Sequence, residues 1–173
     1  MENEDLIEEY IMGALFALMK EKPFASITVT DIAKKAGVSR ITYYRRFKSK
    51  EEVIIRYFAR QTSNYQQETG FRPRNKEDYY EAIFTAFSQF KKQKEFMKLL
   101  LDANVQYIYL DVLNRGMSGD YSIRQYGQSK YDSAYFAGAL YNMSFEWLKN
   151  DCQDSVKSIT DAFFNLAFSN NNI

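Results

Sequence analysis

The sequence predicts an all-α protein, with an N-terminal three-helix helix-turn-helix domain followed by a C-terminal helical domain. Three observations support this fold class. Only 7 glycines and 2 prolines interrupt the 173 residues, so helix-breaking positions are scarce. Long segments repeat their apolar residues every three or four positions, as amphipathic helices do. Hydrophobic residues make up 46% of the chain, which is enough for a packed core.

The first helix is predicted from Asn3 or Glu4 to Lys20. Pro23 ends this segment, because proline lacks the amide hydrogen that a continuing helix needs. The apolar residues of the segment form one stripe, which comprises Leu6, Ile7, Tyr10, Ile11, Ala14, Leu15, Leu18 and Met19.

Two short helices joined by a glycine are predicted next. Thr28 and Asp31 form a capping box that opens the first of them, since each side chain can bond to the other's backbone amide. Gly37 supplies the turn, in a left-handed conformation that other residues adopt only at a cost. Ser39 caps the second helix, which we expect over residues 40–47.

A fourth helix is predicted to begin at a second capping box, formed by Ser49 and Glu52. The chain becomes polar over residues 61–75, and we expect the domain boundary there. The predicted domains are therefore residues 1–60, which form the helix-turn-helix domain, and residues 61–173, which form the second helical domain.

The second domain is predicted from four periodic segments. An amphipathic helix covers residues 79–90, and the next helix runs from residue 96 to residue 107 and on towards 113. Residues 114–129 contain three glycines and many polar side chains, so we expect a loop. Two closing helices are predicted over about residues 130–149 and 154–169.

Positive charge is concentrated in one short stretch of the chain. Residues 20–60 hold eleven Lys and Arg against four acids, a net charge of +7, although the whole chain carries only +1. Residues 1–19 hold five acids and no base. Such clustering is the footprint of a nucleic-acid-binding surface, and a solvated basic face is the alternative.

Composition argues against catalysis. Histidine is absent, which removes the usual general base, the Ser-His and Cys-His pairs and the commonest zinc ligand. The adjacent acids Glu8 and Glu9, like Glu51 and Glu52, are interpreted as first-turn residues that favour the helix dipole. The sequence contains neither a P-loop nor a G-x-G-x-x-G motif. We therefore expect no enzyme, no cofactor and no metal.

We expect a cytoplasmic protein. Cys152 is the only cysteine, so an intramolecular disulfide is impossible, and a redox-sensing role would need more basic neighbours than Lys149. The sequence has no run of 18 apolar residues, so no membrane span is predicted. The acidic start of the chain, residues 1–5, differs from the basic opening of a secretory signal.

The helix-turn-helix over roughly residues 28–47 predicts binding to duplex DNA. In this motif the second helix enters the major groove, and its first residues reach the base edges. We expect Val38, Tyr43 and Phe47 to point inward, and Arg40 is the leading reader of guanine. The predicted DNA contacts are Thr28, Ser39, Arg40, Ile41, Thr42, Tyr44, Arg45, Arg46, Lys48 and Lys50.

Two stretches of the motif resemble the TetR family of regulators. They are Ile27–Ser39, read as ITVTDIAKKAGVS, and Thr42–Glu52, read as TYYRRFKSKEE. The resemblance covers about residues 5–58. It implies a homodimeric all-helical regulator, usually a repressor, that binds a palindromic operator. It also implies a variable C-terminal domain that dimerises and often binds a small effector.

The resemblance assigns roles to individual residues. Tyr44 matches a tyrosine that donates to a phosphate, Lys50 matches a lysine that contacts the DNA backbone, and Thr28 matches a cap on the phosphate side. Two positions depart from the family pattern. Ile41 stands where many members have a small residue, and it could meet a thymine methyl group. Arg46 stands where an aromatic residue or a histidine is frequent.

The last two helices are predicted to form the dimer interface. Residues 135–148 are apolar around almost the whole helix, so more than one face must be buried. A thicker monomeric core is the alternative. The predicted interface residues are Ala134, Gly138, Tyr141, Phe145, Ile159, Phe163 and Leu166.

For the second domain, a small effector, a protein partner and no ligand at all stay open as alternatives, because aromatic stripes at helical spacing are more often core. The candidate lining residues of an effector pocket are Tyr80, Phe84, Phe87, Leu100, Asn104, Tyr107 and Trp147. The second functional hypothesis keeps the fold but makes the protein a coactivator that acts through a protein partner. An intact basic face favours DNA binding over this alternative.

Overall fold

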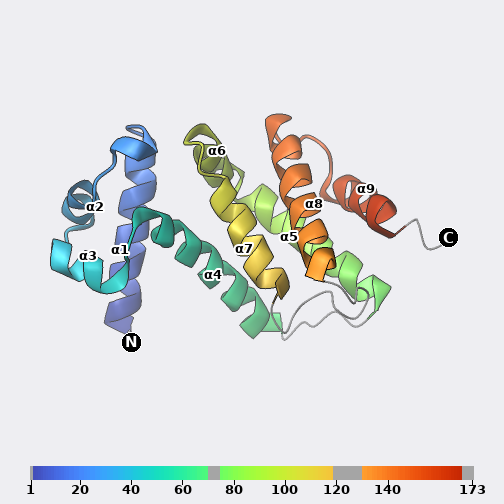
Figure 1. Cartoon of the computed structure of the whole chain (residues 1–173), viewed down its shortest axis with the longest axis horizontal. Coiled ribbons are helices and arrows are strands. Elements are labelled where there is room, and N and C mark those ends of the chain that lie inside the picture. Colours follow the sequence, from blue (N-terminus) through green and yellow to red (C-terminus); the bar gives the residue numbers. More distant parts are fainter. Residues whose placement is uncertain (1, 70–74, 119–129, 169–173) are drawn as a thin grey trace. The chain divides into compact units, whose positions relative to one another are not determined.

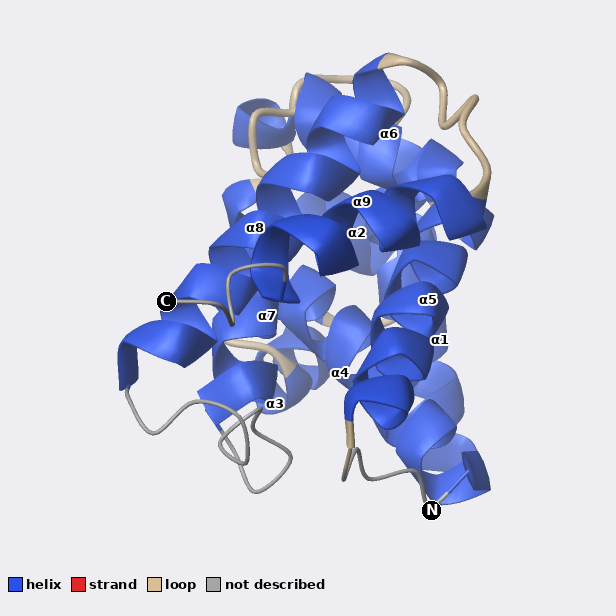
Figure 2. Ribbon diagram, turned by 90° about the vertical axis from the view of Figure 1, so that its right-hand side faces the viewer, coloured by secondary structure: helices blue, strands red, loops and turns tan. Residues whose placement is uncertain are grey.

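The computed structural model describes residues 2–69, 75–118 and 130–168. Regular structure in these ranges is entirely helical, since Figure 2 draws their regular elements in blue and none in the red of strands, and the all-α prediction is confirmed. Among the described residues, no helix combines the length and the apolar character needed to cross a bilayer. The chain divides into two compact units, Met1–Glu68 with Leu99–Ile108, and Thr69–Lys98 with Tyr109–Ile173.

Figure 1 labels the α-helices in chain order. The helices of the first half are α1 (Glu2–Met19), α2 (Val29–Ala36), α3 (Arg40–Arg46) and α4 (Lys50–Thr69), with a 3-10 turn η1 (Phe24–Ser26) after α1. Those of the second half are α5 (Lys76–Lys92), α6 (Lys94–Asp102), α7 (Tyr107–Ser118), α8 (Lys130–Lys149) and α9 (Val156–Phe168).

The first unit is built around the apolar stripe of α1. Ile11 and Leu15 have no exposed surface, and Ile32 of α2 and Ile54 of α4 are equally buried. Phe16 of α1 also meets the ring of Tyr57 edge-on, at 5.1 Å between centroids. Helix α1 therefore packs against α2, and Phe16 joins it to α4.

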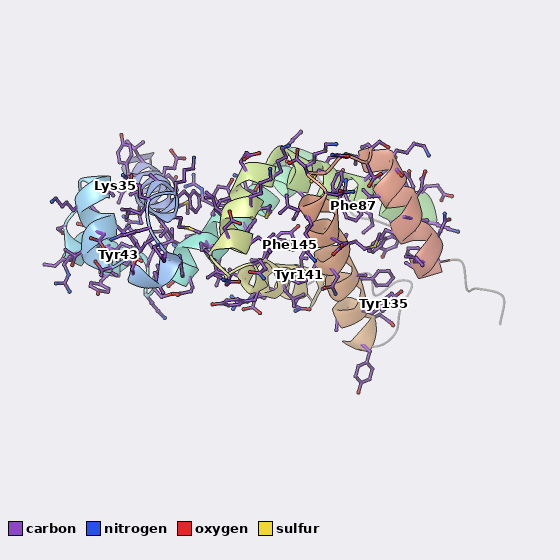
Figure 3. All side chains as sticks on the ribbon, turned by 90° about the horizontal axis from the view of Figure 1, so that it is seen from above. Lys35, Tyr43, Phe87, Tyr135, Tyr141 and Phe145 are labelled. Atoms are coloured by element: carbon purple, nitrogen blue, oxygen red, sulfur yellow. The ribbon has the colours of Figure 1, made fainter. Side chains whose placement is uncertain are left out.

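The second unit packs aromatic side chains between α5, α8 and α9. Phe87 of α5 makes edge-on contacts with Trp147 and with Phe163, each at 6.0 Å between ring centroids. Phe90 meets Phe145 in the same way at 5.5 Å. Phe87 and Phe145 are labelled in Figure 3, on neighbouring helices of this unit. Such pairs add to the free energy gained by burying the rings.

One expectation about helix bounds was wrong. The single helix expected from residue 96 towards 113 is two helices, because the chain breaks after Asp102 and Asn104 adopts a left-handed φ of 55°. Helix α4 continues through polar residues to Thr69, and the two compact units divide between Glu68 and Thr69, within the stretch where we expected the domain boundary. The predicted domains, residues 1–60 and 61–173, stay a prediction. Residues 70–74, which are part of the expected boundary, lie outside the described residues. The same holds for residues 119–129 of the expected loop, whereas its first residues, 114–118, belong to α7.

Candidate nucleic-acid interface

The cap of α2 forms as predicted. Thr28 Oγ1 accepts a hydrogen bond from the Asp31 amide at 3.1 Å, and the Asp31 carboxylate accepts one from the Thr28 amide at 2.8 Å. At the other end, Gly37 has a φ of 68° and its amide donates to the carbonyls of Ala33 and Lys34. Both ends of α2 are therefore closed by local bonds, and the turn direction into α3 is set by Gly37.

Two ion pairs join α2 to the segment that follows α1. Lys22 Nζ lies 2.8 Å from the Asp31 carboxylate, and Lys35 Nζ lies 2.6 Å from that of Glu21. The hydrogen bond from Lys22, helped by those from Thr28, holds the pKa of Asp31 far below its ordinary value of 3.8. These contacts neutralise part of the basic stretch and fix the helix that supports α3.

Helix α3 begins at a cap and turns one face into the core. The Thr42 amide donates to Ser39 Oγ at 3.0 Å, and the two hydroxyl oxygens lie 2.9 Å apart. Tyr43 and Phe47 have no exposed surface, and their rings pack at 5.9 Å between centroids. Figure 3 labels Tyr43 within this unit. The expected inward positions of these two aromatic residues are confirmed.

The opposite face of α3 carries two cations, a phenol and an aliphatic side chain. Arg40, Ile41, Tyr44 and Arg45 are all exposed, Ile41 by 80% and Tyr44 by 51%. The Arg40 guanidinium carbon stands 6.0 Å from the centroid of the Tyr44 ring. We call these four residues the α3 face. Guanidinium and phenol groups can bond to phosphate oxygens and to base edges, so the face has the chemistry of a DNA-reading surface.

The other predicted contacts lie around this face. Thr28 and Lys48 are exposed, while Arg46 is half-buried and its carbonyl accepts a bond from Arg56 at 3.3 Å. The Lys50 amine donates to the carbonyls of Phe24 and Ile27 and stands 4.3 Å from the centroid of the Phe24 ring. Lys50 therefore links η1 to α4, and this structural role is separate from its predicted contact with DNA.

Sequence reasoning missed Arg56, which holds the end of α3 in place. Its guanidinium lies 2.9 Å from the Glu8 carboxylate, 3.1 Å from that of Glu52, and 5.0 Å from the centroid of the Phe47 ring. Glu8 is only 8% exposed, so its role is an interhelical ion pair and not the first-turn acid that we expected. The one available signal was the placement of Arg56 four residues after Glu52.

The predicted dimer residues fall into two groups. Phe145, Ile159 and Phe163 are between 1% and 8% exposed and belong to the core of the second unit. Ala134 is exposed, Leu166 is 71% exposed, and Gly138 and Tyr141 are half-buried. Leu166 and Ala134, together with Tyr131 and Tyr135 at 71% and 55% exposure, give α8 and α9 an outward apolar surface.

The predicted effector residues are divided between the two units. Leu100, Asn104 and Tyr107 belong to the first unit, whereas the other four belong to the second. Phe87 and Trp147 are core residues, Phe84 is half-buried, and the Tyr80 hydroxyl donates to the Asp161 carboxylate at 2.6 Å. A groove of about 570 Å³ runs along α8 and α9, and of the seven candidates it is lined by Trp147 alone.

The fold and the α3 face define an all-α protein with an N-terminal helix-turn-helix domain. Residues 11–57 match the family described as bacterial regulatory proteins, tetR family. The N-terminal domain of this chain therefore matches the TetR family, and the predicted resemblance is confirmed.

Curated relatives match this chain over only part of its length. The chain is 30% identical over 105 residues to the uncharacterized HTH-type transcriptional regulator YerO of Bacillus subtilis, covering 57% of this chain and 36% of YerO. It is 46% identical over 45 residues to the HTH-type transcriptional regulator EthR of Mycobacterium tuberculosis, covering 26% of this chain and 21% of EthR. The matched part thus spans about a third of YerO and a fifth of EthR.

Solved structures resemble the chain over almost its whole length. They include FadR of Bacillus subtilis in complex with stearoyl-CoA (TM-score 0.58, 20% identity, 93% of this chain and 97% of that one). They also include the dihydroxyacetone kinase operon activator DhaS (0.58, 17%, 94% of both chains). A third is NalD, the secondary repressor of the MexAB-OprM pump in Pseudomonas aeruginosa (0.59, 14%, 96% of both). These likenesses show the fold.

Proposed function

We propose that this protein is a homodimeric regulator of transcription that binds a palindromic DNA operator through α3 and represses the adjacent gene. The α3 face carries the proposal. Arg40, Tyr44 and Arg45 stand exposed on a helix whose other side is fixed by the buried Tyr43 and Phe47. A helix presented in this way fits the major groove, where its first residues meet base edges and its flanks meet phosphates.

The charge distribution also supports DNA binding through α3. Within the basic stretch, Lys22, Lys35 and Arg56 are held in ion pairs with acids of the domain itself. Lys34 and Lys48 are exposed, as are the two arginines of the α3 face. Apart from the exposed Lys20 and Lys34, the accessible positive charge outside these ion pairs lies on α3 and directly after it, which favours phosphate binding over a generally solvated basic face.

We propose that α8 and α9 form the dimer contact. Leu166 and the exposed residues of α8, Tyr131, Ala134 and Tyr135, provide an apolar surface that a second copy would bury. A two-fold dimer would place two α3 helices against the two halves of a palindrome. Replacing Leu166 with Asp should convert the dimer to a monomer in sedimentation equilibrium. An unchanged mass would place the dimer contact elsewhere.

We further propose that a small effector releases the DNA. FadR of Bacillus subtilis, which shares the fold, was solved in complex with stearoyl-CoA. Acyl-CoA thioesters of graded chain length are therefore the first compounds to test, with free CoA as the control. Release of bound duplex by an acyl-CoA but not by CoA would support this part of the proposal. No release by any chain length would remove acyl-CoA as the effector class.

One experiment tests the central proposal. The purified full chain is used to select duplexes from a random-sequence pool, and the enriched DNA is sequenced. Enrichment of a palindrome supports a sequence-specific dimeric regulator. If the folded protein enriches no duplex, the coactivator hypothesis gains weight, and a protein partner should then be sought. Repression is read separately, by a reporter gene placed behind the enriched palindrome.

A further inference from the structure

Ile41 is the aliphatic member of the α3 face, and its exposure sets it apart. It is 80% exposed, although isoleucine is among the residues most often buried in proteins. A single exposed apolar side chain on an arbitrary surface needs no explanation. Ile41, however, is the second residue of α3, where a recognition helix is closest to the base edges.

The neighbours of Ile41 leave its side chain directed away from the domain. Ser39 and Thr42 are occupied with each other in the cap, at 2.9 Å between their hydroxyl oxygens. Tyr43 is completely buried on the opposite side of the helix. Arg40 lies along the ring of Tyr44, one turn further on. Ile41 is therefore mostly exposed to solvent and projects from the face that meets DNA in the proposed function.

The chemistry of the major groove restricts what an isoleucine can meet there. Its side chain neither donates nor accepts hydrogen bonds, so it would leave the polar edges of guanine, cytosine and adenine without partners. The apolar group that the four standard base pairs present in this groove is the C5-methyl of thymine. The β-branched side chain is also stiff, so little rotational freedom is lost when it is packed against that methyl group.

From this we propose that Ile41 is a specificity-determining residue that packs against the C5-methyl group of a thymine in each half-site. The inference rests on the proposed function, because it requires that α3 enter the major groove. It also identifies the chemical feature that α3 selects in the operator. This feature is the methyl group of a thymine next to the base or phosphate that Arg40 contacts.

The test removes one methyl group from the DNA and the matching side chain from the protein. The probe is the palindrome enriched by the wild-type chain, with each thymine replaced in turn by deoxyuridine, which pairs identically but lacks the methyl group. Affinity is measured for the wild type, Ile41→Ala and Ile41→Val. Because position 41 is exposed and alanine is the best helix former, Ile41→Ala should fold, as circular dichroism and thermal melting can confirm.

We expect one thymine per half-site to be sensitive. Replacing this thymine in one half-site should weaken wild-type binding about fourfold, and replacing it in both should weaken binding about fifteenfold. These factors correspond to the loss of one buried methyl group per half-site. Ile41→Ala should bind the thymine operator correspondingly more weakly and should no longer distinguish thymine from uracil at that position. Ile41→Val, which keeps both γ carbons and loses only the δ-methyl group, should retain part of the discrimination. Affinity for random duplex should fall by a smaller factor than affinity for the palindrome in both variants.

The outcomes distinguish a failure of the Ile41–methyl contact from a failure of DNA binding itself. If a palindrome is enriched but no thymine is sensitive to uracil, Ile41 reads no methyl group and the inference is wrong while DNA binding stands. The same conclusion follows if Ile41→Ala keeps the wild-type sensitivity. If no duplex is enriched at all, the proposed function fails and the inference fails with it.

Discussion

Arg56 of α4 and Glu8 of α1 are joined by an ion pair of 2.9 Å at the level where α3 ends. The same guanidinium donates to the carbonyl of Arg46, the last residue of α3, at 3.3 Å. Arg56 thus ties the end of the recognition helix to two longer helices of its unit. Because Arg56 contacts both Glu8 and the Arg46 carbonyl, a shift of α4 relative to α1 would also move the end of α3.

We predict that Arg56→Ala lowers both the stability of the protein and its affinity for DNA. Glu8 would be left as a buried acid without its cation, at a cost of about 1–3 kcal/mol, between the values for surface and buried pairs. The free energy of unfolding, from urea titration, measures the first effect. DNA affinity at a temperature where the variant is fully folded measures the second.

Arg60→Ala is the matched control for Arg56→Ala. Arg60 pairs with Glu9 at 2.9 Å across the same two helices, but Glu9 is largely exposed and the pair does not reach α3. Its loss should cost less than about 1 kcal/mol and leave DNA affinity nearly unchanged. Equal effects of the two alanine variants would show that Arg56 has no special role in positioning α3.

Gly37 and Gly13 should respond to alanine in opposite directions. An added Cβ would meet nothing within 4 Å at either position, so neither change is a steric clash. Gly37 has a φ of 68°, and alanine there should destabilise the protein by about 1–2 kcal/mol. Gly13 lies within α1, and alanine there should stabilise it by about 0.5–1 kcal/mol. Thermal unfolding of both variants tests this, and a destabilising Gly13→Ala would contradict it.

Lys50 and Lys48 should separate a structural lysine from a phosphate-binding one. Lys50 holds the carbonyls of Phe24 and Ile27, so Lys50→Met should lower the melting temperature. Lys48 is exposed, and Lys48→Met should leave the melting temperature unchanged while reducing the salt dependence of DNA binding by about one phosphate. If Lys50→Met changes only the salt dependence of DNA binding and not the melting temperature, Lys50 acts as a DNA contact and its two hydrogen bonds add little to stability.

The capping box of α2 should make stability depend on acid pH. The hydrogen bond from Lys22, with those from Thr28, lowers the pKa of Asp31 in the folded state, so its stabilising contribution is complete above the ordinary value of 3.8. That contribution is lost as the pH falls towards the folded-state pKa. Between about pH 5 and pH 3, the free energy of unfolding should fall more steeply for the wild type than for Asp31→Asn. Parallel curves would refute the assignment.

Local signals in the sequence predicted the helix-turn-helix closely. Capping residues and glycine act on their immediate neighbours, so the cap at Thr28, the turn at Gly37 and the cap at Ser39 were all visible without the fold. The closing helix α8, Lys130–Lys149, was predicted with the same bounds because its hydrophobic run is long. The Ser49 cap also forms, although the Glu52 carboxylate accepts its bond from the amide of Lys48 and not from that of Ser49.

Contacts between distant residues could not be predicted in this way. Glu8 and Arg56 are 48 positions apart, and their pairing depends on how α1 and α4 cross. Asn104 ends a helical pattern through a left-handed φ, and no proline or glycine marks the break. The division of residues 134–166 into core and surface likewise depends on packing. A helix that is apolar on all sides does not reveal which side meets its own domain and which would meet another chain.

The roles of Arg40 and Tyr44 should differ. Tyr44→Phe removes a hydroxyl assigned to a phosphate, so it should weaken binding to every duplex by a similar factor. Arg40→Ala should also relax the sequence preference, because a bidentate contact to guanine carries base information. Competition between the enriched palindrome and random duplex measures the preference. Equal losses on both for Arg40→Ala would rule it out as a base reader.

The most direct test of the central claim is equilibrium binding of the full-length chain to labelled duplex DNA over a range of salt concentrations. If each half of a dimer neutralises about three to five phosphates, the logarithm of the binding constant should fall with the logarithm of the salt concentration, with a slope of about −5 to −9. Simultaneous replacement of Arg40 and Arg45 by alanine should make the slope shallower. Folded protein that shows no affinity for any duplex, even in dilute salt, would contradict the account.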